Sequence, residues 1–153
     1  MGARALVLGA LLLAACSSEG SNPGNTYAIY SYNCCVELSG QTIWHAGDHL
    51  TLHWRSETRQ VPDRTAHLVS LRLTLTGPFQ TVDSLKQVIS QKQVPRGLHS
   101  IQAATLAVTD RSGGAPASQL DLPPDLAPGF YNLGSIIAEG NYQGSGGIII
   151  QVQ

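Results

Sequence analysis

Hydrophobic and polar residues alternate along much of this chain with a period of two, which is typical of β-strands. The clearest run is 67–76, where apolar side chains alternate with hydroxyl-bearing or charged ones. A shorter run, 49–54, follows the same pattern and ends at Trp54. Because one face of each run is apolar, we expect Trp54, Leu71 and Leu73 to lie in a buried core.

Other segments complete an all-β pattern. A turn is predicted at 46–48, a polar loop at 57–64, and a stop to the strand 67–76 at Gly77-Pro78. The segment 82–89 has apolar residues at helical spacing, but its β-like flanks favour a strand or a short irregular piece. Further strands are predicted at 27–32, 36–43, 98–109, 119–122, 130–138 and 147–152.

The glycine-rich segment Gly144-Ser145-Gly146-Gly147 joins the last two predicted strands. It lacks a lysine and a following helix, so a hairpin turn is favoured over a phosphate-binding loop. With turn signals roughly every ten residues, the pattern predicts about seven to nine short strands in one sandwich or barrel over residues 26–153. Neither an internal repeat nor a second domain boundary is visible.

The first fifteen residues have a different character. Arg4 gives the start one positive charge, and about eleven mainly apolar residues follow. This stretch is too short for a membrane span, which needs about 20 apolar residues. It ends in Leu13-Ala14-Ala15-Cys16, which resembles the bacterial lipobox. The resemblance implies a lipoprotein signal peptide at 1–15, diacylglycerol on Cys16 and cleavage before it; the alternative is an ordinary secretory signal with a chance cysteine.

Residues 16–25 follow as the lipidated cysteine and a polar stretch rich in Ser, Gly and Asn, which predicts a flexible tether. The lipobox resemblance therefore implies an extracytoplasmic domain anchored in the cell envelope through membrane lipid. No aspartate follows Cys16 directly. By the same resemblance, a host with two membranes would send the protein to the outer one.

Charge excludes one class of partner. Without Arg4 the chain keeps eight basic and ten acidic residues, a formal charge of −2, and charged residues are only 12% of the full sequence. No basic patch is visible, so nucleic acid is not an expected partner. The low-charge, hydroxyl-rich composition suits an extracytoplasmic β-protein.

Two segments sharpen the fold prediction. Residues 46–54 and 120–131 resemble, respectively, the second strand and the late Pro/Gly turn of bacterial extracellular immunoglobulin-like domains. The resemblance implies an immunoglobulin-like β-sandwich, with Tyr131 as the tyrosine-corner residue whose hydroxyl bonds back to upstream backbone. The cysteine pair that links the two sheets of antibody domains is absent, which excludes that class.

Cys34 and Cys35 are the only thiols besides Cys16. In an oxidising compartment they form a vicinal disulfide, stay buried as free thiols, or bridge to a second chain. We favour the vicinal disulfide, although a trans peptide holds neighbouring Cα atoms at ~3.8 Å, closer than in ordinary disulfides. Asn33 suggests a kink just before the pair.

The spacing of the histidines gives only a weak indication of a metal site. His45 and His49 have the H-x-x-acid-H spacing of a zinc hydrolase, but that site needs a helix and Gly47 stands in the middle. His49 and His53 lie about 13 Å apart on a strand, too far to share one metal. Exposed strand histidines are therefore favoured, while cross-strand pairing with His67 or His99 stays open.

The last two predicted strands loosely resemble the end of periplasmic copper carriers of the copper-resistance C type, and this resemblance implies copper binding as an alternative function. Those carriers begin with a histidine that this chain lacks, and no methionine survives removal of the signal peptide. The expected protein therefore has no metal, no cofactor and no catalytic residues. It is a binding or accessory surface domain, not an enzyme, for an unidentified protein or glycan. The tyrosines of 27–32 suggest an aromatic patch, although a core-and-rim role is favoured.

Overall fold

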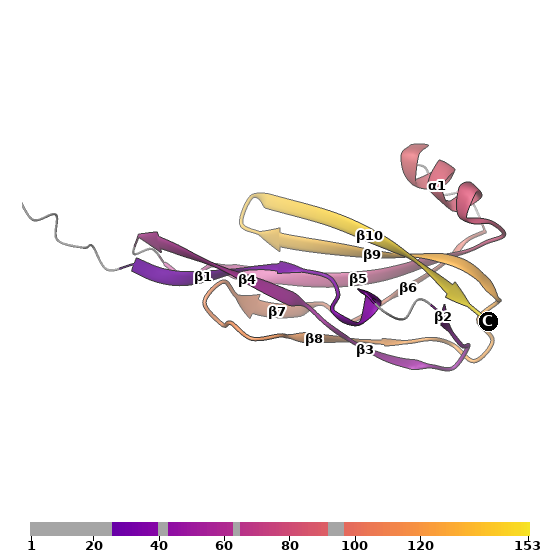
Figure 1. The fold of residues 1–153 in the computed structure, drawn as a ribbon, viewed down its shortest axis with the longest axis horizontal. Helices are drawn as coiled ribbons and strands as arrows, with labels where there is room; N and C mark the ends of the chain where they lie inside the picture. Colours follow the sequence, from indigo (N-terminus) through magenta and orange to yellow (C-terminus); the bar gives the residue numbers. More distant parts are fainter. Residues whose placement is uncertain (1–25, 40–42, 63–64, 92–96) are drawn as a thin grey trace, which may run out of the picture.

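The computed structural model describes residues 26–39, 43–62, 65–91 and 97–153 (Figure 1). Within these ranges the chain forms ten β-strands and one short α-helix, so the fold is all-β in its main part. No helix in them is long and apolar enough to cross a membrane. The predicted signal peptide, Cys16 and the predicted tether lie outside the described residues. The elements are β1 (Thr26–Asn33), the 3₁₀ helix η1 (Glu37–Ser39), β2 (Ile43–Trp44), β3 (His49–His53), β4 (Arg55–Pro62), β5 (Leu68–Phe79), α1 (Val82–Gln91), β6 (His99–Gln102), β7 (Leu106–Thr109), β8 (Ala117–Asp121), β9 (Gly129–Glu139) and β10 (Tyr142–Val152).

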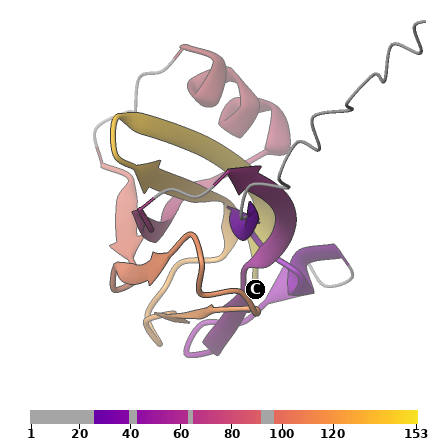
Figure 2. The same cartoon turned by 90° about the vertical axis from the view of Figure 1, so that its left-hand side faces the viewer.

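The strands form one large sheet and two ribbons. The large sheet has the order β2-β10-β9-β5-β6, and β7 also pairs with β5. The ribbons are the antiparallel pairs β1-β4 and β3-β8. Figure 1 shows these strands running along the long axis, with β1 starting at one end and the C-terminus at the other; Figure 2 shows the same layers end-on.

A single hydrophobic core lies between the large sheet and the ribbons. Strand β5 contributes every second residue, and Leu71 and Leu73 are fully buried, as the alternation predicts. Leu50, Leu52 and Trp54 enter the same core from β3 and the residue after it. The Trp54 indole N–H donates to Ser118 Oγ at 3.0 Å, so its one polar atom is satisfied in the core.

The polar loop predicted at 57–64 is wrong for its described part. Residues up to Pro62 belong to β4, which pairs with β1 along eight positions, from Asn33 opposite Arg55 to Thr26 opposite Pro62. Most β4 side chains are exposed. Because β4 buries little on either face, its sequence does not alternate between apolar and polar residues, and alternation therefore does not predict this strand.

The segment 82–89 is also not a strand, because it lies within helix α1. The Thr81 Oγ1 accepts the Ser84 backbone N–H at 3.1 Å, and the Thr81 N–H donates to Ser84 Oγ at 3.3 Å, which together cap the first turn. Leu85 is the buried residue of the helix. The helical spacing of the apolar residues was therefore the better indicator.

Four smaller boundaries differ from the sequence prediction. Gly77-Pro78 does not end β5, which continues to Phe79, and 36–43 is no strand, since its described residues hold η1 and only the start of β2. The strand 98–109 divides into β6 and β7 because three residues, 103–105, face two on β5 and form a bulge. The segment 144–147 lies inside β10, and the hairpin turns at Gly140, whose φ is +54°.

Candidate functional site

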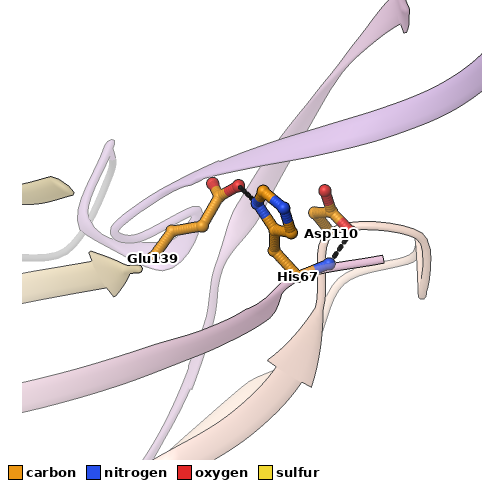
Figure 3. Close-up of side chains that lie close together, drawn as sticks. All are labelled: His67, Asp110 and Glu139. Carbon is orange, nitrogen blue, oxygen red and sulfur yellow. Dashed lines mark hydrogen bonds and ion pairs between the residues drawn. The ribbon is translucent and has the colours of Figure 1, made fainter. Parts of the chain in front are cut away.

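Three side chains that can ligate metal converge where three strands end. His67 directly precedes β5, Asp110 directly follows β7, and Glu139 is the last residue of β9. One ligand atom from each lies within 4.8 Å of the other two, and the imidazole of His67 lies between the two carboxylates (Figure 3). We call these residues the His67 cluster. Within the part of the chain that the structure describes, it is the one such group of three.

Strand pairing fixes the His67 cluster in place. Leu68 pairs with Thr109 and Val69 pairs with Glu139, so the residues next to these pairs are brought together by register. The Asp110 N–H donates to the His67 carbonyl at 2.9 Å, and the His67 N–H donates to Asp110 Oδ1 at 2.8 Å. His67 Nδ1 lies 3.0 Å from Glu139 Oε1. The backbone therefore holds two of the three groups rigidly.

Asp110 is the most buried charged residue of the described chain, at 1% exposure. Its carbonyl accepts the Tyr30 N–H at 2.7 Å, which joins β1 to the His67 cluster. The Tyr32 hydroxyl donates to the neighbouring Thr109 carbonyl at 3.1 Å. Burial, and then the negative charge of Asp110, raise the pKa of Tyr32 above its usual value.

A cleft of about 470 Å³ opens beside the His67 cluster. Residues 30–34 form one wall, and the β9–β10 hairpin between Leu133 and Ile148 forms the other. We call this the β1–hairpin cleft. Its volume lies within the range of small-ligand sites. Glu139 belongs both to this cleft and to the His67 cluster, so the two form one region.

Glycines shape the hairpin wall of the cleft. Gly144 and Gly146 stand on the core-facing side of β10, opposite Ile137 and Ser135 of β9. A Cβ on Gly144 would lie 3.0 Å from the Tyr142 hydroxyl, and one on Gly146 would lie 3.2 Å from Ser135 Oγ. Because these two residues have no side chains, the hairpin leaves open space where other strands fill the core.

A second cavity, of about 550 Å³, lies on the opposite face of the same hairpin. Ile89 of α1 and Ile136 and Ile149 of the sheet contribute to its lining. It contains no histidine, acid or tyrosine. The β1–hairpin cleft is the better candidate, because aromatic, hydroxyl and carboxylate groups converge there.

Comparison with known proteins identifies no relative: no protein-family model, no curated protein and no solved structure matches the chain.

The structure does not bring the sequence-predicted histidines together. His45 and His49 flank a turn and His49 begins β3, so the helix that a zinc hydrolase site would need is absent there. His45 lies 3.8 Å from Asp48, whereas His49 Nδ1 lies 2.8 Å from Asp121 Oδ1.

The remaining histidines are also separated. His53 bonds to Glu37 of η1. His99 pairs with Gly77, about 30 Å along β5 from His67 at ten residues of ~3.3 Å each. The side chains that lie beside His67 are therefore two carboxylates, and not a second histidine.

The adjacent cysteines lie where β1 ends. Cys34 and Cys35 are joined by a disulfide across a cis peptide bond, with their Cα atoms 3.1 Å apart. Cys35 is buried and Cys34, which is half-buried, lines the β1–hairpin cleft. The chain leaves the strand directly after Asn33, the position where a kink was expected.

The structure shows what contacts Tyr131 and the tyrosines of residues 27–32, which the sequence analysis singled out. The Tyr131 hydroxyl donates to the Ala127 carbonyl four residues upstream at 2.6 Å, and burial raises the pKa of Tyr131. Tyr30 and Tyr32 line the cleft, while the ring of Tyr27 lies 4.3 Å from the Arg111 guanidinium carbon.

Sequence reasoning missed Asp110 and Glu139. Neither residue stands in a local motif, because their meeting depends on the register of β7 and β9 with β5. The one available signal was an acidic residue directly at the end of a predicted strand, next to a turn.

Proposed function

We propose that this chain is a lipid-anchored extracytoplasmic lipoprotein whose domain, residues 26–153, binds a ligand in the β1–hairpin cleft. The observation that carries the proposal is the cleft itself, with about 470 Å³ of space between β1 and the hairpin. The anchor is supported by the complete lipobox at residues 13–16. A binding role is preferred to a catalytic one because the cleft combines recognition groups without an evident nucleophile and base pair.

We further propose that the domain is an immunoglobulin-like β-sandwich. Support comes from the bond between the Tyr131 hydroxyl and the Ala127 carbonyl, which is the geometry of a tyrosine corner. The buried Trp54 after β3, between the large sheet and a ribbon, is a second feature of such domains.

The chemistry of the cleft favours a glycan as the ligand. Tyr30 on one wall and Tyr142 at the hairpin offer aromatic rings, against which the C–H faces of a sugar ring can pack. Ser135 and Glu139 add hydroxyl and carboxylate acceptors for sugar hydroxyls. Tyr142 is 67% exposed, so one aromatic ring is already presented to solvent.

The test uses a substitution that fills the cleft. Binding of N-acetylglucosamine oligosaccharides is measured by calorimetry and saturation-transfer NMR. The variant is Gly144→Val, because its new methyl groups enter the cleft beside the flexible Tyr142 side chain. We expect at least a tenfold loss of affinity, since the ligand and the valine would occupy the same space.

The matched control is Gln143→Val, which places a valine at the neighbouring position on the other face of β10. It should bind as the unsubstituted protein does. Equal weakening by both substitutions, or binding of extended peptides in place of sugars, would contradict a glycan site in this cleft.

A further inference from the structure

We propose that His67, Asp110 and Glu139 form a binding site for a divalent transition metal such as Zn²⁺. This inference does not depend on the proposed glycan function, because it rests on the His67 cluster alone. Its ligands are one imidazole nitrogen and two carboxylate groups, a mixed set that suits Zn²⁺ better than the all-oxygen shells preferred by Ca²⁺ and Mg²⁺.

The spacing of the ligand atoms supports this assignment. Zn²⁺ binds nitrogen and oxygen at ~2.0–2.2 Å, so ligand atoms around one tetrahedral ion lie about 3.3–3.6 Å apart. In the His67 cluster, His67 Nδ1 and Glu139 Oε1 are 3.0 Å apart, and all three ligand atoms lie within 4.8 Å of one another. Side-chain shifts of about 1 Å would therefore bring the three ligand atoms onto one ion.

The backbone around the cluster is suited to holding an ion. A metal site is strongest when its ligands are oriented before the ion arrives. The His67 N–H donates to Asp110 Oδ1 at 2.8 Å, which orients the Asp110 carboxylate beside the His67 side chain. Asp110 is also almost fully buried, and a bound cation stabilises an ionised carboxylate at such a depth.

A metal ion can reach the His67 cluster from solvent. The His67 side chain is 48% exposed and Glu139 is 29% exposed, so an ion can reach both from solvent. Glu139 also lines the β1–hairpin cleft. A three-ligand site at the edge of a cleft has room for water or a ligand atom as the fourth donor.

The competing interpretation is that the three side chains form only a structural hydrogen-bonded network. The experiment titrates Zn²⁺ into the full chain, purified in detergent without a histidine tag, by isothermal titration calorimetry. We expect one Zn²⁺ per chain. Substitutions His67→Ala and Asp110→Asn should each weaken binding at least tenfold, because each removes a direct ligand.

The matched control is His49→Ala. His49 is also an exposed histidine whose Nδ1 lies 2.8 Å from a carboxylate, that of Asp121, but among the described residues this pair belongs to no group of three possible ligands. Its substitution should leave Zn²⁺ binding unchanged. Equal loss in all variants, or no saturable binding, would overturn the proposal, as would binding of Ca²⁺ in preference to Zn²⁺.

A second measurement avoids the risk that Asp110→Asn fails to fold. The five histidines of the unsubstituted chain can be followed by NMR of their imidazole nitrogens during the titration. The His67 signals should shift first and saturate at one equivalent. Shifts that appear first at His45, His49, His53 or His99 would show that zinc binds elsewhere and would overturn the assignment.

Discussion

Leu71, Leu73 and Trp54 are each fully buried and contact one core from two sides. Two of them come from the central strand β5 and the third from the residue after β3. Their apolar atoms leave water on folding, and Trp54 also places its indole N–H on Ser118. Stability therefore depends on a few large side chains from distant segments.

We expect Leu71→Ala, Leu73→Ala and Trp54→Ala each to lower the free energy of unfolding by about 2–5 kcal/mol, because each leaves a cavity in a packed core. Thermal and urea melts would measure the losses. The control is Lys86→Ala, at an exposed position of α1, which should change stability by less than about 0.5 kcal/mol. Unchanged melts for all three core variants would mean that the strand faces are inverted.

Glu37 gives a second prediction at this scale. Burial alone would raise its pKa, but the side-chain bond to His53, backbone N–H donors and the His53 charge together lower the pKa of Glu37 below its usual 4.5. The unfolded chain thus binds a proton more readily than the folded one. The stabilisation is present above pH ~4.5 and is lost as the pH falls through the lower folded-state pKa.

The measurement compares melts of the unsubstituted protein and Glu37→Gln from pH 3 to pH 8. Near neutral pH the substitution should destabilise by about 1 kcal/mol, because a charge-assisted hydrogen bond is weakened. The difference should shrink in the acid range. A difference that stays constant over the whole range would show that ionised Glu37 contributes nothing.

Several elements were predictable from the sequence because one of their faces is buried. The alternation of β5 and β3 sets both the type of element and the side that faces the core. The ribbon strand β4 was missed because its side chains are mostly exposed, and α1 was missed although its spacing was helical. The His67 cluster could not be found, since register between β5, β7 and β9 assembles it.

The end of β1 carries the next prediction. Because the Cys34–Cys35 disulfide joins neighbours at the wall of the cleft, the purified protein should have no reactive thiol and should run as a monomer on a non-reducing gel. Intact-mass spectrometry should find it lighter than its reduced form by two hydrogen atoms. An unchanged mass, or a dimer band that reduction removes, would contradict a vicinal bridge.

At the scale of the whole molecule, we expect the described domain and the first fifteen residues to have separate roles. Burial and pairing account for the fold from Thr26 onward. The lipobox ending at Cys16 accounts for the expected location.

We expect Cys16→Ser to release the protein from membranes or to leave it as unprocessed precursor, because two acyl chains are what hold such a protein stably. Fractionation of cells labelled with palmitate measures both outcomes. Cys35→Ser serves as the control and should keep its label and its membrane association. A labelled, membrane-bound Cys16→Ser protein would show that the anchor lies elsewhere.

The position of the cleft on β1 affects the ligand concentration that the cleft would meet at a membrane. Tyr30 follows Thr26 by four residues, about 13 Å of strand, and the ten residues from Cys16 to Asn25 span at most about 35 Å when fully extended. An anchored domain would therefore search a thin layer above its own bilayer. A ligand fixed in that layer would meet the cleft at an effective concentration approaching the millimolar range. A weak intrinsic affinity would then suffice for high occupancy of the cleft. Binding assays on a domain released from the membrane would underestimate that occupancy.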